Sequence, residues 1–290
     1  PLTIDEIDDG FFDMLNEKVP EKYAFLSVGQ WTKGNYGEDR KDLARTIKVF
    51  YESFANVKKQ PALIMKTSGA TYSIMDKEDI LKKINKIKSQ FPSDWKLPNV
   101  YLLHGDLSGE EMNYLYNHPK VKTFISFTHG EGYGRPLQEA TMTGLPVIAS
   151  NWSGHLDFLD TEKSILVEGV LTKVPKSAVW KDIVIEQSQW FNINESSARK
   201  ALIYSFKNEY EMKNRAKSLM DINREKFIHK KMTKRLINLV KKYSDKLPKH
   251  VGLTLPKLRK TNDMQVANKN ELSKIKLPKL KKVTSEGATV

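Results

Sequence analysis

The stretch that decides the fold is Ser126-Phe-Thr-His-Gly-Glu-Gly-Tyr-Gly-Arg-Pro-Leu-Gln-Glu-Ala-Thr-Met-Thr-Gly-Leu-Pro-Val-Ile-Ala-Ser150. It predicts the end of a buried strand, a glycine-rich turn, a short helix that begins near Pro136, and a second buried strand. Gly130, Gly132 and Gly134 leave room for backbone N–H groups to face a ligand. Because these donors would lie at a helix N-terminus, which favours negative charge, the stretch predicts a phosphate site.

Outside this stretch, short apolar runs alternate with segments of helical periodicity. The runs that predict strands are 23–29, 62–65, 100–103, 123–127, 147–150 and 165–167. Strand–helix alternation with short connections predicts an α/β fold with a parallel sheet, and such sheets bind ligands at the carboxyl ends of their strands. We expect four segments: a linker or remnant over 1–20, the α/β domain over 21–175, a helical part over 176–244, and a basic tail over 245–290.

Composition restricts the class of protein. The 290 residues include no cysteine, which excludes disulfides, thiol nucleophiles and cysteine-ligated metal centres. No run approaches the roughly 20 apolar residues of a membrane helix, which excludes an integral membrane protein. Scattered histidines without a partner carboxylate at ligand spacing argue against a metal site. We expect a cytoplasmic protein, of the host cytoplasm if the chain is viral.

The net charge of +13 is concentrated at the C-terminal end. Residues 245–290 hold 11 Lys or Arg and 4 Asp or Glu, a net of +7, and Leu-Pro-Lys occurs there three times. Proline and mutually repelling lysines predict a disordered tail. Two interpretations stay open: the tail binds an anionic surface or polyanion, or it is a solvated tail. It lacks interleaved aromatic residues, which argues against sequence-specific nucleic-acid binding.

Two carboxylates accompany the predicted phosphate site. Glu131 lies in the turn, and Glu139 follows about two helical turns later. Carboxylates accept hydrogen bonds from vicinal hydroxyls, so a pair of them beside a phosphate cradle favours a nucleotide sugar. The sequence has neither a P-loop motif nor Gly-x-Gly-x-x-Gly after its first strand. On spacing alone, an ordinary strand–turn–helix with surface glutamates explains the pattern equally well.

Residues 126–150 resemble the motif of retaining glycosyltransferases of the GT-B type, close to family 4. The pattern Glu-Gly-Phe-Gly-x-Pro-x-x-Glu-Ala is matched by 131–140, and small-Gly-x-Pro-Val-Ile-Ala-Ser by residues up to Ser150. The element order from Tyr23 to Val167 follows that family's donor-binding domain, and 153–157 stand where the family has Gly-Gly-x-x-Glu. Less closely, 63–69 and 128–131 resemble glycosyltransferase-like proteins of tailed bacteriophages.

The resemblance implies a Rossmann-like sheet that forms the C-terminal half of a GT-B hexosyltransferase. The donor would be a UDP- or GDP-linked sugar, transferred with retention and without metal or other cofactor. Glu139 would bind the donor ribose, and Glu131 would contact hydroxyls of the donor sugar. Backbone N–H groups of Gly132, Tyr133 and Gly134 would line the sugar and the diphosphate.

The family's Arg and Lys after the first strand neutralise the leaving diphosphate. Here Gln30 replaces that Arg just after Gly29, and the loop that follows is longer. Lys41 is our candidate for the Lys, with Arg40 and Lys33 as alternatives, and Arg135 is a candidate for the missing charge. The predicted donor site also includes Gly29, Gln30, Lys66 and His129. A role for His129 in stabilising the turn is an equal alternative.

The predicted acceptor side is incomplete. A GT-B enzyme needs two Rossmann-like halves, and only about 20 residues precede the first strand, so we expect the donor half alone. The acceptor, which could be a glycan, a lipid, a protein or a DNA base, would bind an N-terminal domain lost upstream or supplied by another chain. Alternatives are a non-catalytic nucleotide-sugar or glycan-binding module, a sugar-nucleotide epimerase, and a structural protein whose basic tail binds polyanions.

Overall fold

The computed structural model describes residues 9–32, 36–181 and 183–246. Lys33 and the basic tail after residue 246 lie outside the described residues. The chain divides into two units, Pro1–Leu236 and Ile237–Val290, and the candidate site belongs wholly to the first.

The first unit is built on a parallel sheet of six strands. The strands are β1 (Ala24–Gln30), β2 (Ala62–Ser68), β3 (Val100–Leu103), β4 (Val121–Ser126), β5 (Val147–Ser150) and β6 (Ile165–Val167). Their order is β3-β2-β1-β4-β5-β6, and every neighbouring pair is parallel. The direction of winding reverses between β1 and β4, and this reversal is where sheets of this type bind ligands at the carboxyl ends of their strands. The predicted α/β fold is therefore confirmed.

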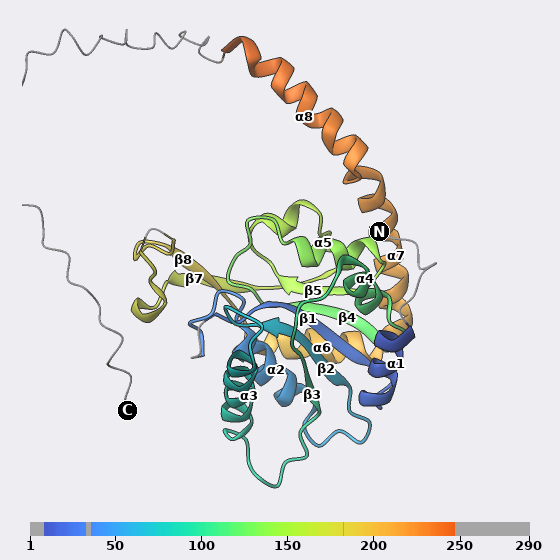
Figure 1. Cartoon of the computed structure of the whole chain (residues 1–290), viewed down its shortest axis with the longest axis vertical. Helices are drawn as coiled ribbons and strands as arrows, with labels where there is room; N and C mark the ends of the chain where they lie inside the picture. The colour runs from blue at the N-terminus through green and yellow to red at the C-terminus, as the bar shows by residue number, and fades with distance from the viewer. Residues whose placement is uncertain (1–8, 33–35, 182, 247–290) are drawn as a thin grey trace, which may run out of the picture. The chain divides into compact units, whose positions relative to one another are not determined.

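Helices cover both faces of the sheet (Figure 1). On one face α2 (Leu43–Phe54), α3 (Ile74–Lys88) and α6 (Glu195–Lys207) bury one apolar cluster. On the other, α1 (Asp9–Lys18), α4 (Gly109–Asn117), α5 (Arg135–Met142) and α7 (Glu209–Lys226) bury a second. Strand β1 serves both faces: Phe25 lies in the first cluster and Leu26 in the second, as the twofold period of a strand requires.

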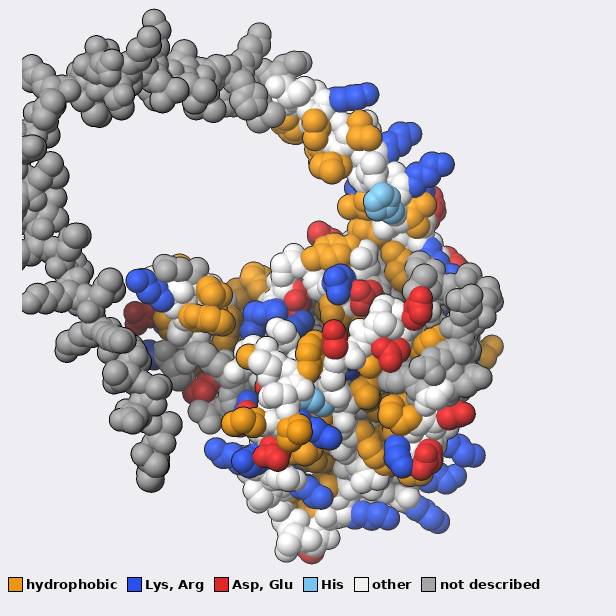
Figure 2. All heavy atoms as spheres, in the orientation of Figure 1, with side chains coloured by type: hydrophobic (Ala, Val, Ile, Leu, Met, Phe, Trp, Pro, Cys, Tyr) orange, Lys and Arg blue, Asp and Glu red, His pale blue; other side chains and the backbone are white. Residues whose placement is uncertain are grey.

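A two-stranded hairpin interrupts the predicted helical part. Strands β7 (Gly169–Lys173) and β8 (Gln189–Ile193) pair antiparallel, and the segment between them contains the short helix η2 (Lys176–Ala178). Helical structure after the hairpin consists of α6, α7, α8 (His229–Tyr243) and η3 (Ser244–Lys246). Figure 2 shows hydrophobic side chains on the surface of the β7–β8 region, beside Lys or Arg side chains.

The tryptophans Trp152, Trp180 and Trp190 differ in exposure. Trp190, on β8, is buried and stacks on His129 of the turn after β4, whereas Trp152 and Trp180 are exposed. Trp180 lies in the segment that connects β7 and β8. Among the residues that the structure describes, none of the helices has the length and apolar character needed to cross a bilayer.

Candidate functional site

The glycine-rich turn after β4 is fastened to the loop that precedes α2. The His129 N–H and the Thr128 hydroxyl both donate to the carbonyl oxygen of Arg40, over 2.9 and 3.1 Å. The Arg40 guanidinium donates in return to the carbonyl of Gly130, at 2.7 Å. Two segments ninety residues apart in sequence therefore form one rigid edge at the point where the sheet reverses its winding.

Glu131 is the centre of a buried charge cluster at this edge. Its Oε1 lies 2.5 Å from Lys41 Nζ, and its Oε2 lies 3.1 Å from Arg40 Nη1. Only 7% of the Glu131 side chain is exposed. Burial alone would raise its pKa, but the charges and hydrogen bonds of Lys41 and Arg40 outweigh burial and lower the pKa below its usual 4.5. Glu131 is therefore ionised at neutral pH.

Gly29 allows Lys41 to reach Glu131. A β-carbon at Gly29 would lie 3.1 to 3.2 Å from three carbons of the Lys41 side chain, closer than ordinary contact. The lysine therefore passes directly over the end of β1. Gln30, the next residue, is exposed at the last position of β1. Among the predicted cations, the structure brings Lys41 and Arg40 to the turn, while Lys33 is outside the described residues.

Helix α5 begins directly after the turn. Gly134 caps it with φ 88°, a left-handed conformation that suits glycine, and a β-carbon there would come within 3.2 Å of His155 and Leu137. The first N–H groups of any helix lack partners within the helix and carry partial positive charge. A β-carbon at Gly134 would also lie 3.6 Å from Cγ of Glu131, so the start of the helix adjoins the side chain that pairs with Lys41 and Arg40.

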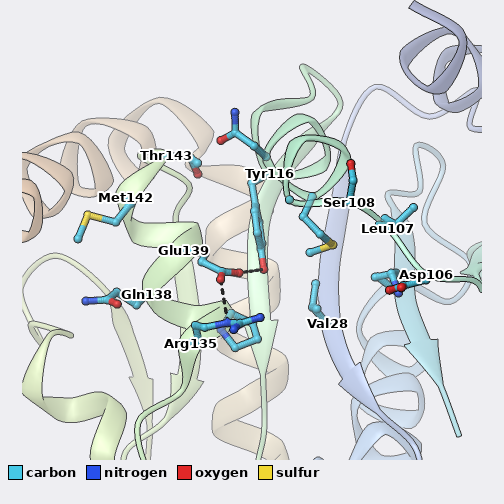
Figure 3. A pocket seen from close by; sticks show the side chains of 15 residues that line it. Val28, Asp106, Leu107, Ser108, Tyr116, Arg135, Gln138, Glu139, Met142 and Thr143 are labelled. Carbon is cyan, nitrogen blue, oxygen red and sulfur yellow. Dashed lines mark hydrogen bonds and ion pairs between the residues drawn. The ribbon is translucent and has the colours of Figure 1, made fainter. Parts of the chain in front are cut away.

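Glu139, on α5, is held by two neighbours. Its Oε2 accepts a hydrogen bond from the Tyr116 hydroxyl at 3.1 Å, and its Oε1 lies 3.1 Å from Arg135 Nε (Figure 3). Burial and the adjacent Glu139 both raise the pKa of Tyr116, so this hydroxyl stays protonated and keeps donating. The Arg135 side chain is 84% exposed. Arg135 therefore lies beside Glu139 rather than beside Glu131.

A cavity of about 470 Å3 opens next to Glu139. Its walls come from the end of β1, the loop after β3, α4 and α5, and Figure 3 shows Val28 and Asp106 across from Glu139. Lys66, also in the wall, donates from Nζ to the carbonyl of Gly105 at 2.7 Å. Burial lowers the Lys66 pKa, and the nearby Asp106 partly opposes that shift. The volume matches small-ligand sites in proteins.

His129 lies beneath the turn, not on its surface. Its ring stacks on Trp190 with centroids 4.6 Å apart, and Nδ1 lies 2.8 Å from the carbonyl oxygen of Phe191, to which it donates. Burial lowers its pKa to about 4, so the ring is neutral. The structure therefore shows contacts through which His129 stabilises the turn, and its contact with the donor stays a prediction. The hairpin β7–β8 is attached to the site through this ring.

Two residues at the site were not predicted from the sequence. Tyr116 was expected only as part of a short helix, yet it positions Glu139. Ser153 accepts a hydrogen bond at Oγ from the Glu131 N–H, at 2.7 Å. The sequence indicated Ser153 only by the serine that stands where the family it resembles has glycine. Trp31, directly after β1, is fully buried and packs in the first apolar cluster.

Of three comparisons with known proteins, the comparison of three-dimensional structures found matches. No protein-family model matches the chain, and no curated protein matches it significantly. HepE from Anabaena, solved with UDP and glucose, has a TM-score of 0.56 at 10% identity; the match covers 83% of this chain and 55% of HepE. Sucrose-phosphate synthase from Thermosynechococcus elongatus gives 0.55 at 15% identity, with 84% and 51% covered. An α,α-trehalose-phosphate synthase from Burkholderia vietnamiensis gives 0.55 at 10%, with 82% and 48% covered.

The chain has a Rossmann-like fold of the GT-B type. The fold implied by the motif at 126–150 is thus confirmed, while the resemblance to bacteriophage proteins stays a prediction. The chain spans about half the length of these solved structures. Within the described ranges, no group of three or more His, Cys, Asp or Glu could hold a metal ion.

Proposed function

We propose that this chain is the donor-binding half of a retaining glycosyltransferase that uses a nucleoside diphosphate sugar without a metal ion. The observation that carries the proposal is the convergence of Lys41, Arg40 and the α5 N-terminus on Glu131, beside a cavity that contains Glu139. These groups follow the order in which the donor is joined: Glu131 for the sugar, the cations and the start of α5 for the diphosphate, and Glu139 for the ribose.

Each group has a role in this proposal. The nucleoside enters the 470 Å3 cavity, where Glu139 accepts hydrogen bonds from ribose hydroxyls and Lys66 lines the wall. The diphosphate lies at the start of α5, facing the N–H groups of 132–134 and the cations of Lys41 and Arg40. Glu131, which is ionised, accepts hydrogen bonds from hydroxyls of the donor sugar.

The fixed cations would act on the bond that breaks. When the anomeric carbon separates from the diphosphate oxygen, negative charge grows on the leaving group. Lys41 and Arg40 are already held by Glu131 and by the turn, so they need no rearrangement to stabilise that charge. The acceptor hydroxyl then attacks the anomeric carbon from the face that the diphosphate leaves and gives its proton to the departing diphosphate oxygen, so that the configuration is retained.

In this proposal the acceptor binds a second Rossmann-like half rather than this one. A glycan, a lipid, a protein or a DNA base could supply the hydroxyl or amino group, bound by an N-terminal half in this polypeptide or in another. A second candidate function is a nucleotide-sugar-binding module without transferase activity. The same residues, Glu139 in the cavity and the cations beside Glu131, would bind such a donor without transferring its sugar.

Calorimetric titration with UDP, GDP and ADP tests the donor site. We expect saturable binding of one nucleotide, and at least a tenfold weakening in Glu139→Ala, because a hydrogen bond from the ribose to a charged group is lost. Glu78→Ala, an exposed glutamate on α3, is the matched control and should bind normally. Binding that is absent, or equal in Glu139→Ala and the wild type, would contradict the proposal. Sugar release from UDP-glucose and GDP-mannose, with and without candidate acceptor domains, separates transferase from binding module.

A further inference from the structure

Ser153 has a backbone conformation that serine rarely adopts. Its φ is 80° and its ψ is −162°. Among the described residues, two other non-glycine residues have positive φ, Asp42 at 50° and Asn56 at 61°, and both fit the ordinary left-handed region. The Ser153 combination is occupied almost only by glycine, because a β-carbon strains it. Such strain persists only where surrounding contacts enforce it.

The contacts around Ser153 join its loop to the glycine-rich turn. The Glu131 N–H donates to Ser153 Oγ at 2.7 Å, and the Gly154 N–H donates to the Glu131 carbonyl at 3.0 Å. A β-carbon at Gly154 would lie 2.1 Å from the carbonyl oxygen of Gly132, so the two loops touch through backbone alone. Both backbone groups of Glu131 are thus fixed by residues 153 and 154.

The side chain of Ser153 explains why serine is present at a strained position. Glycine would adopt this backbone without strain but has no acceptor for the Glu131 N–H. Alanine would keep the strain and also lack the acceptor. Serine is the smallest residue that supplies the oxygen, so the strain and the hydrogen bond come together. Stability alone would favour glycine over serine at this position.

We propose that Ser153 is a positioning residue of the donor site. Its hydroxyl fixes the Glu131 backbone, which keeps the Glu131 carboxylate between Lys41 and Arg40 and sets the direction of the N–H groups that follow it. The effect of Ser153 on donor binding rests on the proposed function, in which Glu131 contacts the donor sugar. The hydrogen bond itself can be tested independently of any ligand.

Three variants of the full chain separate positioning from stability. Ser153→Gly removes the hydroxyl and the strain, and Ser153→Ala removes the hydroxyl alone. Asn56→Gly is the matched control: Asn56 has positive φ, and its Oδ1 accepts the Lys96 N–H at 2.8 Å, but it lies outside the site. Two measurements need no ligand: the thermal midpoint and hydrogen exchange of the Glu131 amide. The third is calorimetry, which compares the affinity for UDP-glucose, GDP-mannose and ADP-glucose with the affinity for the corresponding nucleoside monophosphates.

We expect opposite effects on stability and identical effects on binding. Ser153→Gly should raise the thermal midpoint by about 2–6 °C and Ser153→Ala should lower it. In both, exchange of the Glu131 amide should accelerate about five- to tenfold. Both should weaken the nucleotide sugar about five- to tenfold, with the nucleoside monophosphate unchanged. Asn56→Gly should alter the midpoint alone.

Two results would overturn the inference. Unchanged exchange of the Glu131 amide in both Ser153 variants would show that the hydroxyl does not hold this backbone. Equal weakening of the nucleotide sugar and the monophosphate would show general loosening of the fold rather than positioning of Glu131. If the wild type binds no nucleotide sugar, the proposed function fails while the exchange measurement still decides whether Ser153 fixes Glu131.

Discussion

Removing Lys41 tests the charge cluster most directly. In Lys41→Ala, the buried carboxylate of Glu131 keeps only Arg40, whose side chain is 48% exposed. Loss of one partner from a buried pair costs about 3–5 kcal/mol when the other ion is left alone. A half-exposed pair contributes about 0–1 kcal/mol. We therefore expect the free energy of unfolding at pH 8 to fall by about 2–4 kcal/mol, or the thermal midpoint by about 5–10 °C.

The dependence on pH distinguishes this cause from a loss of packing. In the wild type the pKa of Glu131 is lowered, so its stabilising contribution is complete above about pH 4.5 and is lost as the pH falls through the folded-state pKa. In Lys41→Ala, burial dominates and raises that pKa, so protonation on acidification stabilises the variant relative to its unfolded state. The stability difference between wild type and variant should therefore narrow from pH 8 to pH 4.

Urea unfolding followed by circular dichroism at pH 8, 6 and 4 measures the difference. Lys41→Ala combined with Glu131→Gln should recover most of the lost stability, because no unpaired charge remains buried. Lys18→Ala is the matched control, since Lys18 pairs with Glu17 at 2.7 Å on an exposed surface and should cost under about 1 kcal/mol. A difference that is constant across pH, or a double variant as unstable as Lys41→Ala, would refute the electrostatic explanation.

Three further substitutions give separate predictions. Arg135→Ala should change the free energy of unfolding by less than about 0.5 kcal/mol, because the Arg135 side chain is exposed. It should still weaken nucleotide binding, because Glu139 loses the ion pair that holds it, and an unaltered affinity in calorimetry would contradict this role of Arg135. Burial raises the pKa of Asp42 from 3.8 to about 7, so the folded state holds the Asp42 proton more tightly than the unfolded state and the free energy of unfolding should fall as the pH rises from 4 to 7. Asp42→Asn should flatten this fall when the free energy is measured by urea unfolding, and an unchanged dependence on pH would disprove the prediction. Trp190→Ala exposes the His129 ring and should move the pKa of His129 from about 4 toward 6.5, which an NMR titration of the ring protons measures. A pKa that stays near 4 would show that Trp190 does not cause the burial.

The sheet could be predicted from sequence because its signals are local. Runs such as 62–65 and 147–150 are apolar and directly follow a proline, and each became a strand within a few residues of its expected bounds. The turn and start of α5 were equally readable, since Gly134 and Pro136 impose backbone conformations that few other sequences share. Local conformational preference therefore carried most of the fold.

The site contacts were harder to predict because they join distant segments. The pairing of Lys41 with Glu131 spans ninety residues, and only the fold shows that Arg40 reaches the same carboxylate. The family resemblance made Arg135 a candidate for the missing charge at the diphosphate, whereas its guanidinium lies against Glu139. The hairpin β7–β8 was missed because Gln189–Ile193 is short and follows a segment of mixed polarity.

The pairing of Glu131 with both cations has a consequence for turnover. In the proposed function, an intact donor brings sugar hydroxyls that satisfy Glu131 while its diphosphate shares Lys41 and Arg40. After transfer the hydroxyls leave with the product, and the carboxylate competes again with the nucleotide for the same two cations. The site would thus favour substrate over spent nucleotide by internal charge competition, and its own carboxylate would act as the displacing anion that limits product inhibition.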